Sequence, residues 1–292
     1  MKFGLVVNLL KSEAIQFARE LCAWGEERGT PFLLYTEEAE ALGLEGMTTE
    51  RWLQEVNIAL VIGGDGTFLK AARLTQDTNI ALFGVCLGHL GFLAVGNPGH
   101  IREEIAQFER GDYQAQPRHL LEGILTTAEG ERHVYALNDL VLSKGIQARL
   151  ISIDVQVQKK PMCVYRADGL IVSSPTGSTA YALSAGGPIV PPSLECMLLV
   201  PICAHTLYAR PTLVGPQDRL TLRPINNNSE IFLTVDGEDV YPMRCGDKLE
   251  VTLSNEHFIH IASLPQFDYY DLLHEKLQWG LNPVAERGNR YA

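Results

Sequence analysis

The residues best suited to chemistry lie in one short stretch, Gly63-Gly64-Asp65-Gly66-Thr67, which follows the apolar run Ile58–Ile62. Such a run is typical of a strand buried on both faces of a parallel sheet. Glycines let the backbone turn sharply beside a ligand because they carry no Cβ. Thr67 is expected to cap a helix, whose first N–H groups would face the same ligand. We therefore predict a phosphate loop formed by Gly63, Gly64, Gly66 and Thr67.

Asp65 places a carboxylate at the centre of this loop. A carboxylate beside a phosphate is unfavourable by charge unless it has a function, such as binding a metal ion or accepting the proton of an attacking hydroxyl. Aspartate is also an ordinary turn residue, so the loop alone leaves both interpretations open. The loop matches neither the Walker pattern nor the G-x-G-x-x-G pattern.

The composition limits the classes of partner. The formal net charge is −11, which argues against nucleic acid or an anionic membrane as the main partner. The longest apolar run, residues 196–204, is too short to span a membrane. The chain begins with a strand-like run instead of a signal peptide, and its six cysteines include no C-x-x-C pair. We therefore expect a cytoplasmic protein with reduced thiols and no metal site built by the protein alone.

Strand and helix patterns alternate over the first part of the chain, which favours a doubly wound, Rossmann-like α/β domain. In such domains ligands bind beyond the carboxyl ends of the strands, where the glycine loop falls. The acidic segment 37–50 is interpreted as a solvated loop that leads into a short helix. The strands are expected at residues 3–7, 31–35, 58–62 and 80–85, and the helices from about residues 12, 67 and 101.

The pattern changes near Pro117. Strictly alternating runs such as Ile151–Gln158 indicate antiparallel strands, and helical periods are rare from residue 120 to 263. The closing segment places Tyr270, Leu273 and Leu277 on one helical face, and we expect that terminal helix to return to the first domain. The predicted domains are residues 1–117 with 266–292, of α/β type, and residues 118–265, which are β-rich and sandwich-like.

A second group of candidate residues lies in the segment 168–188, which reads D-G-L-I-V-S-S-P-T-G-S-T-A-Y-A-L-S-A-G-G-P. Short hydroxyl side chains, exposed backbone and the ring of Tyr181 suit a ribose or a nicotinamide amide. The alternative is a polar turn that caps a short helix through Ser178. Each residue singly fits a structural role, whereas the density of such residues favours a binding site.

Taken together, these motifs resemble those of the NAD kinase family, and the resemblance extends along nearly the whole chain. G-G-D-G-T also occurs in lipid kinases and, more loosely, in phosphofructokinases, so it indicates phosphoryl transfer without naming the acceptor. T-G-S-T-A-Y at 176–181 is much more specific, and lipid kinases lack it. The matching motifs, in order, are G-G-D-G-T (63–67), L-G-F-L (90–93), N-D-L-V-L (138–142), D-G-L-I-V-S-S-P-T-G-S-T-A-Y (168–181), S-A-G-G-P-I (184–189), His205 with Arg210-Pro211, and K-L-Q-W-G (276–280).

The resemblance implies an α/β and a β-rich domain that bind the dinucleotide between them, in a homo-oligomer such as a dimer or tetramer. It implies transfer of the γ-phosphoryl of ATP, or of polyphosphate in some members, to the 2′-hydroxyl of the adenosine ribose of NAD, with Mg²⁺ on the donor phosphates. Asp65 matches the catalytic residue, and Gly66 the phosphate turn. The remaining residues expected at the substrates are Lys70, Asn138, Asp139, Arg149, Arg166, Asp168, Thr176, Thr179, Ala180, Tyr181, Ala182, Leu183 and Ser184.

Several points stay open at this stage. Lys70, Arg149 and Arg166 fit ordinary solvated cations as well as ligand contacts. Asp139, Cys86 and Glu238 stand where the family usually has Glu, Asn and Gln, and we expect these departures to shift affinity or the preference between NAD and NADH. The alternative functions are a kinase of the same loop type that acts on a lipid or small alcohol, and a dinucleotide-binding sensor without catalysis.

Overall fold

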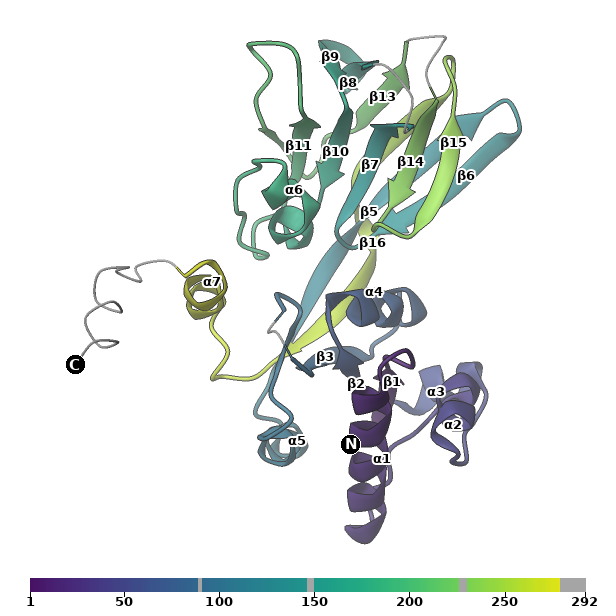
Figure 1. Ribbon diagram of the computed structural model, residues 1–292, viewed down its shortest axis with the longest axis vertical. Coiled ribbons are helices and arrows are strands. Elements are labelled where there is room, and N and C mark those ends of the chain that lie inside the picture. The colour runs from purple at the N-terminus through teal and green to yellow at the C-terminus, as the bar shows by residue number, and fades with distance from the viewer. Residues whose placement is uncertain (89–90, 146–149, 226–229, 279–292) are drawn as a thin grey trace, which may run out of the picture. The chain divides into compact units, whose positions relative to one another are not determined.

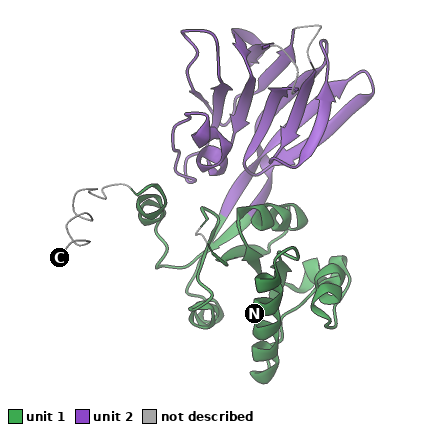
Figure 2. Cartoon of the chain, viewed as in Figure 1, with its two compact units in different colours: residues 1–116, 260–292 green, residues 117–259 purple. Residues whose placement is uncertain are grey.

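The computed structural model describes residues 1–88, 91–145, 150–225 and 230–278. The chain divides into two compact units, Met1–Gln116 with His260–Ala292 and Pro117–Ile259 (Figure 2). The predicted domain bounds, residues 1–117 with 266–292 and residues 118–265, stay a prediction.

The first unit is built on a parallel sheet. β1 (Phe3–Val7), β2 (Ile58–Gly63) and β3 (Ala81–Cys86) pair in that order (Figure 1), and every residue in them is buried. β4 (Ala94–Gly96) also pairs with β3, as does the last part of β16 (Lys248–Ser263). Because both faces of the sheet are covered, the strands carry continuous apolar runs, as the sequence predicts.

Helices pack on both faces of this sheet. α1 (Ser12–Glu27) and α5 (Ile101–Arg110) share one core with the residues of β1 that alternate from Phe3. On the opposite face, α3 (Thr49–Glu55) presses the Trp52 ring against Gly4, where a Cβ would come within 2.4 Å of the ring. α4 (Asp65–Leu74) contacts β2 and β3. The predicted doubly wound arrangement is therefore confirmed.

Two local predictions in this unit are wrong. Residues 31–35 form isolated bridges instead of a strand, with Leu33 hydrogen-bonded to the backbone of Phe3 and Leu5. The segment expected to be a solvated loop contains α2 (Thr36–Leu42). Ala39 and Leu42, three residues apart, are buried in the core around α1, and this burial outweighs the acidic composition that suggested solvation.

The second unit contains two antiparallel sheets, and the predicted sandwich-like arrangement is confirmed. One sheet has the order β12-β11-β10-β7-β14-β15, and the other contains β16, β13, β8 and β9, with β5 and β6 attached to β16. Alternate side chains of both sheets meet in one core. The bounds are β5 Gln114–Thr127, β6 Gly130–Ala136, β7 Asp139–Lys144, β8 Ile151–Val157, β9 Lys160–Ala167, β10 Gly169–Ser173, β11 Met197–Ile202, β12 Thr212–Val214, β13 Leu220–Pro224, β14 Ile231–Val235 and β15 Asp239–Met243.

The closing helix α7 (Tyr269–Leu277) belongs to the first unit, as predicted. Asp268 caps it by accepting hydrogen bonds from the backbone of Tyr270 and Asp271. The Lys276 ammonium lies 5.6 Å from the centre of the Phe92 ring. The predicted apolar face is partly wrong: Leu273 is 2% exposed, whereas Tyr270 is 60% exposed, because the buried face is centred on Leu273.

This packing gives a first prediction. Leu273→Ala should lower the free energy of unfolding by about 2–5 kcal/mol, the usual cost of a truncated buried leucine. Tyr270→Ala, on the exposed side of the same helix, should change it by less than about 0.5 kcal/mol. Denaturant titrations of both variants test this, and equal effects would show that α7 does not pack through Leu273.

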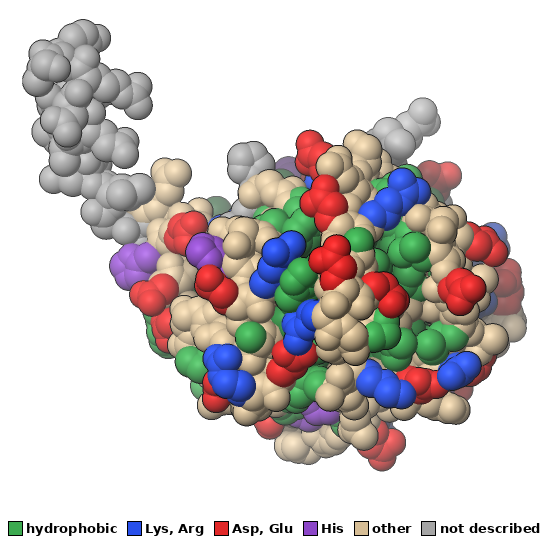
Figure 3. Space-filling view, turned by 90° about the horizontal axis from the view of Figure 1, so that it is seen from below, with side chains coloured by type: hydrophobic (Ala, Val, Ile, Leu, Met, Phe, Trp, Pro, Cys, Tyr) green, Lys and Arg blue, Asp and Glu red, His purple; other side chains and the backbone are tan. Residues whose placement is uncertain are grey.

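Charges of both signs are mixed on the surface. Acidic, basic and hydrophobic side chains are interspersed on the face shown in Figure 3. In the first unit, ion pairs join Arg28 to Glu109 and Arg110 to Asp112. Within the described ranges, no helix is both long and apolar enough to cross a membrane.

Candidate active site

The glycine loop connects the end of β2 to the start of α4. The helix begins at Asp65 with Gly64 as its cap, so the prediction that Thr67 caps it is wrong. Thr67 lies in the first turn instead, with its hydroxyl packed against Gly63, where a Cβ would come within 2.3 Å of Oγ1. The first N–H groups of a helix lack partners within it. This start therefore offers the donor groups that the predicted phosphate loop needs.

The Asp65 carboxylate is held by the second glycine-rich segment. Oδ2 accepts a hydrogen bond from the Phe92 N–H at 3.1 Å, and Oδ1 accepts from Leu93 at 3.1 Å and Ala94 at 3.3 Å. Gly91 makes this approach possible, because a Cβ there would lie 2.1 Å from Oδ1. Asp65 therefore holds a segment that lies 27 to 29 residues further along the chain. A residue that only shaped its own turn would not make these contacts.

Lys70 pairs with acidic residues of α2 in this structure. Its ammonium lies 3.2 Å from a Glu37 carboxylate oxygen and 3.6 Å from one of Glu38. Glu38 is fully buried, and burial raises its pKa even though its carboxylate accepts a hydrogen bond from the Val7 N–H at the end of β1. The proximity of Lys70 offsets part of this cost. The contact of Lys70 with a phosphate stays a prediction.

Most of the remaining candidates gather at one end of the six-stranded sheet. β7 pairs with β10 so that Asp139 lies opposite Ser173. β10 then leads through Ser174 into a 3₁₀ helix, Thr176–Thr179, and the short α6, Tyr181–Ser184 (Figure 1). Asn138, Asp139 and the T-G-S-T-A-Y segment are thereby brought together. Tyr181 and Ser184 are exposed, Thr179, Ala180 and Leu183 are half-buried, and Thr176 and Ala182 are buried.

Two predicted residues lie at the other end of these strands. Asp168 precedes β10 and forms an ion pair of 2.6 Å with Lys144 at the end of β7. Six residues of extended chain separate Asp168 from Ser174, or roughly 20 Å. Arg166 is exposed on β9, and Arg149 lies outside the described residues. The structure therefore does not bring Asp168 or Arg166 beside Asn138 and Asp139.

Asp236 belongs with the Asn138 group, although the sequence drew attention only to its neighbour Glu238, as a departure from the family pattern. The Asp236 side chain is 7% exposed. Its carboxylate accepts hydrogen bonds from the backbone N–H groups of Leu137, Asn138 and Asp139 at 2.8, 2.8 and 3.0 Å. An Asp-Gly pair between two strands usually marks an exposed turn, so the sequence carried no signal for this buried role.

Comparison with protein families identifies the chain. The model of the ATP-NAD kinase N-terminal domain matches residues 3–113, and that of the ATP-NAD kinase C-terminal domain matches residues 137–263. The chain belongs to the NAD kinase family. It is 39% identical to the NAD kinase of Geobacter metallireducens over 90% of this chain and 93% of the relative, and 40% identical to that of Heliobacterium modesticaldum over 95% and 98%.

Solved structures of this family share the fold. The crystal structure of yeast NADH kinase complexed with NADH superposes with a TM-score of 0.85 at 22% identity, covering 97% of this chain and 89% of that one. The NAD kinase of Archaeoglobus fulgidus in complex with ATP gives a TM-score of 0.72 at 20% identity, covering 95% and 99%. Because the sequence identities are only 20–22%, the structural similarity supports a shared fold and nothing more specific.

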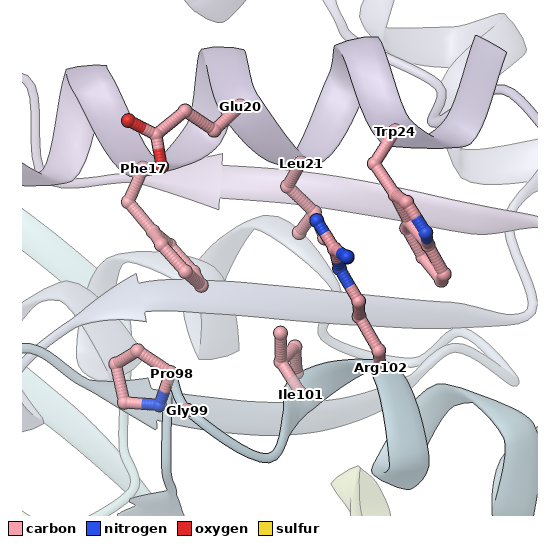
Figure 4. Close-up of a pocket in the computed structure, with 8 residues that line it drawn as sticks. All are labelled: Phe17, Glu20, Leu21, Trp24, Pro98, Gly99, Ile101 and Arg102. Atoms are coloured by element: carbon pink, nitrogen blue, oxygen red, sulfur yellow. The ribbon is translucent and has the colours of Figure 1, made fainter. Parts of the chain in front are cut away.

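A pocket elsewhere in this NAD kinase family member contains none of the predicted site residues. It has a volume of about 300 Å³ and lies between α1 and the start of α5, where the Arg102 side chain extends toward Leu21 and Trp24 (Figure 4). In the described part of the chain, no group of three His, Cys, Asp or Glu side chains is placed to hold a metal ion.

The electrostatics of the Asn138 group are dominated by two buried acids. Asp139 is 4% exposed, and burial, together with the charge of Asp236, raises the pKa of Asp139 to about 7. An aspartate in the unfolded chain has a pKa near 3.9. Folded Asp139 therefore keeps its proton over a range of pH in which the unfolded residue has lost it.

The sign of the resulting pH dependence follows from linkage. Because the folded protein binds the extra proton, the contribution of Asp139 to stability decreases as pH rises from about 4 to about 7 and is constant above that. Asp139→Asn removes the titration, so its stability relative to the wild type should increase over this range by at most about 1.4 kcal/mol per pH unit. Burial also raises the pKa of Glu104 to about 7. Glu104 titrates in both the wild type and the variant, so its contribution cancels in the difference between their stabilities. Denaturant titrations at pH 5 and pH 8 test the prediction, which a pH-independent difference would contradict.

Proposed function

We propose that this chain transfers the γ-phosphoryl group of ATP to the 2′-hydroxyl of the adenosine ribose of NAD, which gives NADP. The observation that carries this function is the match to both ATP-NAD kinase domain models, together with NAD kinase relatives aligned over at least nine-tenths of the chain. The T-G-S-T-A-Y segment next to Asn138 favours a dinucleotide as the acceptor over a lipid.

Asp65 is the catalytic residue in this proposal. Phosphoryl transfer has a loose transition state, so the position of the nucleophile and the stabilisation of charge matter most. Asp65 orients the 2′-hydroxyl and accepts its proton late in the reaction. The hydrogen bonds from Phe92, Leu93 and Ala94 hold the carboxylate in one orientation, which supports a positioning role. The loop of Gly63, Gly64, Gly66 and Thr67 binds donor phosphates, with Lys70 at the same helix.

The acceptor is bound in this proposal by Asn138, Asp139 and residues of the segment 176–184. That segment carries several short hydroxyl side chains and includes the exposed Tyr181 and Ser184, which suit a ribose or an amide. Asp168, Arg166 and Arg149 stay proposed substrate contacts from the family resemblance. We also propose a homo-oligomer, a dimer or tetramer, which light scattering of the purified protein tests.

Mg²⁺ is proposed to enter with ATP. The described residues offer Asp65 but no three-ligand metal site, and Mg²⁺ usually binds through one or two carboxylates plus substrate phosphates. When bound, it would neutralise charge on the donor phosphates. Removal of Mg²⁺ with EDTA should abolish turnover, whereas Mg²⁺ without nucleotide should leave the melting temperature unchanged. A marked stabilisation by Mg²⁺ alone would contradict this mode of binding.

One assay separates the candidate functions. The protein is incubated with NAD, ATP and Mg²⁺, and NADP is measured with an NADP-specific dehydrogenase. NADP formation supports the proposal, and parallel reactions with NADH or polyphosphate define acceptor and donor range. Phosphorylation of a diacylglycerol without NADP formation would support the lipid-kinase alternative. Binding of NAD without turnover would support the sensor.

A further inference from the structure

We propose that Asp236 is a positioning residue for dinucleotide binding, because it fixes the backbone from which the Asn138 and Asp139 side chains project. This inference rests on the proposed function for the role of Asn138 and Asp139. Its geometric basis lies entirely within the second unit.

The carboxylate of Asp236 binds three consecutive N–H groups. Oδ2 accepts from Leu137, and Oδ1 accepts from Asn138 and Asp139. The Asp236 N–H in turn donates to the Asp139 carbonyl at 3.0 Å. A buried carboxylate is stabilised when such donors replace its water. Asp236 therefore accepts hydrogen bonds from all three N–H groups of residues 137–139, the segment that leads into β7.

The turn after β14 brings Asp236 to this position. Val235, the last residue of β14, pairs with Leu140 in β7, so the residue that follows β14 reaches the start of β7. Asp236 then adopts a left-handed backbone with φ of 48°, and Gly237 continues it with φ of 74°. Aspartate tolerates this conformation better than most residues. Aspartate therefore suits both the backbone of the turn and the acceptor role of the side chain.

The opposite side of the segment is held by β10 and the loop that follows. The Asn138 carbonyl accepts hydrogen bonds from the Ser174 N–H at 2.9 Å and the Ser173 hydroxyl at 3.2 Å. Gly177 packs against the same carbonyl, where a Cβ would lie 2.2 Å from the oxygen. Both backbone groups of Asn138 are therefore occupied. These bonds use only the backbone of Asn138, and in the described part of the chain they leave its side-chain amide available to a ligand.

The test compares two substitutions at Asp236 with a control. Asp236→Ala removes all three acceptor contacts, whereas Asp236→Asn keeps one oxygen for Asn138 and Asp139 and loses the bond to Leu137. Asp247→Asn is the control, because the half-buried Asp247 accepts the Arg244 N–H at 2.7 Å in another turn of the same unit. Calorimetric Kd values for NAD are measured first, followed by KM values for NAD and ATP.

A displaced binding segment commonly costs one to two orders of magnitude, so Asp236→Ala should raise the Kd and KM for NAD at least about tenfold. The KM for ATP should change less than about twofold, since positioning acts on one substrate. Asp236→Asn should recover much of the loss, and Asp247→Asn should match the wild type. An equal rise in both KM values, or no rise in either Asp236 variant, would overturn the proposal. If Asp236→Ala fails to fold, Asp236→Asn decides alone: a Kd for NAD above that of the wild type, from the lost bond to Leu137, supports the proposal, and a wild-type Kd overturns it. Absence of NAD binding by the wild type would instead reject the proposed function.

Discussion

Asp65→Asn should lower kcat by at least about 10²- to 10⁴-fold, the usual effect of losing an acid–base group. Asparagine has nearly the same size and also tolerates turn backbones, so a residue that only shaped the turn would be replaced with little loss. Dinucleotide binding should persist, because Asn138 and the segment 176–184 are unchanged. It should even tighten slightly, since one negative charge near the pyrophosphate is removed.

Asparagine at position 65 would keep only part of the hydrogen bonding of the carboxylate. The Asn amide oxygen can still accept from Leu93 and Ala94, but its NH₂ group would face the Phe92 N–H. That lost bond should cost about 1–3 kcal/mol of stability, so kcat is compared on protein shown by circular dichroism to be folded. Asp112→Asn, which removes an exposed carboxylate paired with Arg110 in the same unit, is the matched control.

The decisive measurements are kcat with NAD and ATP and a calorimetric Kd for NAD. A folded Asp65→Asn variant with near-normal kcat would return Asp65 to a turn-forming role and leave the chain without an identified catalytic group. A parallel loss of NAD affinity would assign Asp65 to binding instead.

Gly91→Ala should lower kcat by about 10²-fold while the charge of Asp65 is retained, because a displacement of about 1 Å at a reacting group is enough for such a loss. The backbone of Gly91 is outside the left-handed region, so alanine is allowed conformationally. Its Cβ would lie 2.1 Å from the Asp65 carboxylate oxygen, and the carboxylate must move.

Gly99→Ala provides the control for this variant. Gly99 lies in an exposed loop of the same unit, and its added Cβ would meet only the Asn97 side chain at 3.3 Å. The control should retain wild-type kcat, and both variants should retain the Kd for NAD. A Gly91→Ala variant with unchanged kcat would show that the hydrogen bonds from residues 92–94 do not set the catalytic position of Asp65.

The sequence by itself determined those features that depend on neighbouring residues. The continuous apolar run before Gly63 predicted a buried parallel strand, and the glycines that follow predicted a sharp turn into a helix; the structure confirms both as β2 and α4. The change to alternating runs after Pro117 predicted the β-rich part. Motif resemblance supplied the family, which the comparisons confirm. The spacing of apolar residues and the residue types of a turn are local properties, so they can be recognised in the sequence before the fold is known.

Tertiary structure decided the features that depend on contacts between distant segments. α2 was missed because the burial of Ala39 and Leu42 depends on α1, and the exposure of Tyr270 depends on where α7 docks. Only the fold shows that residues 92–94 hold the Asp65 carboxylate and that Asp236 holds the backbone of Asn138 across nearly one hundred residues. A carboxylate in a turn has the same sequence signature whether it faces water or a buried row of N–H groups. The free energy that separates these two states comes from desolvation and hydrogen bonding, which exist only once the chain is packed.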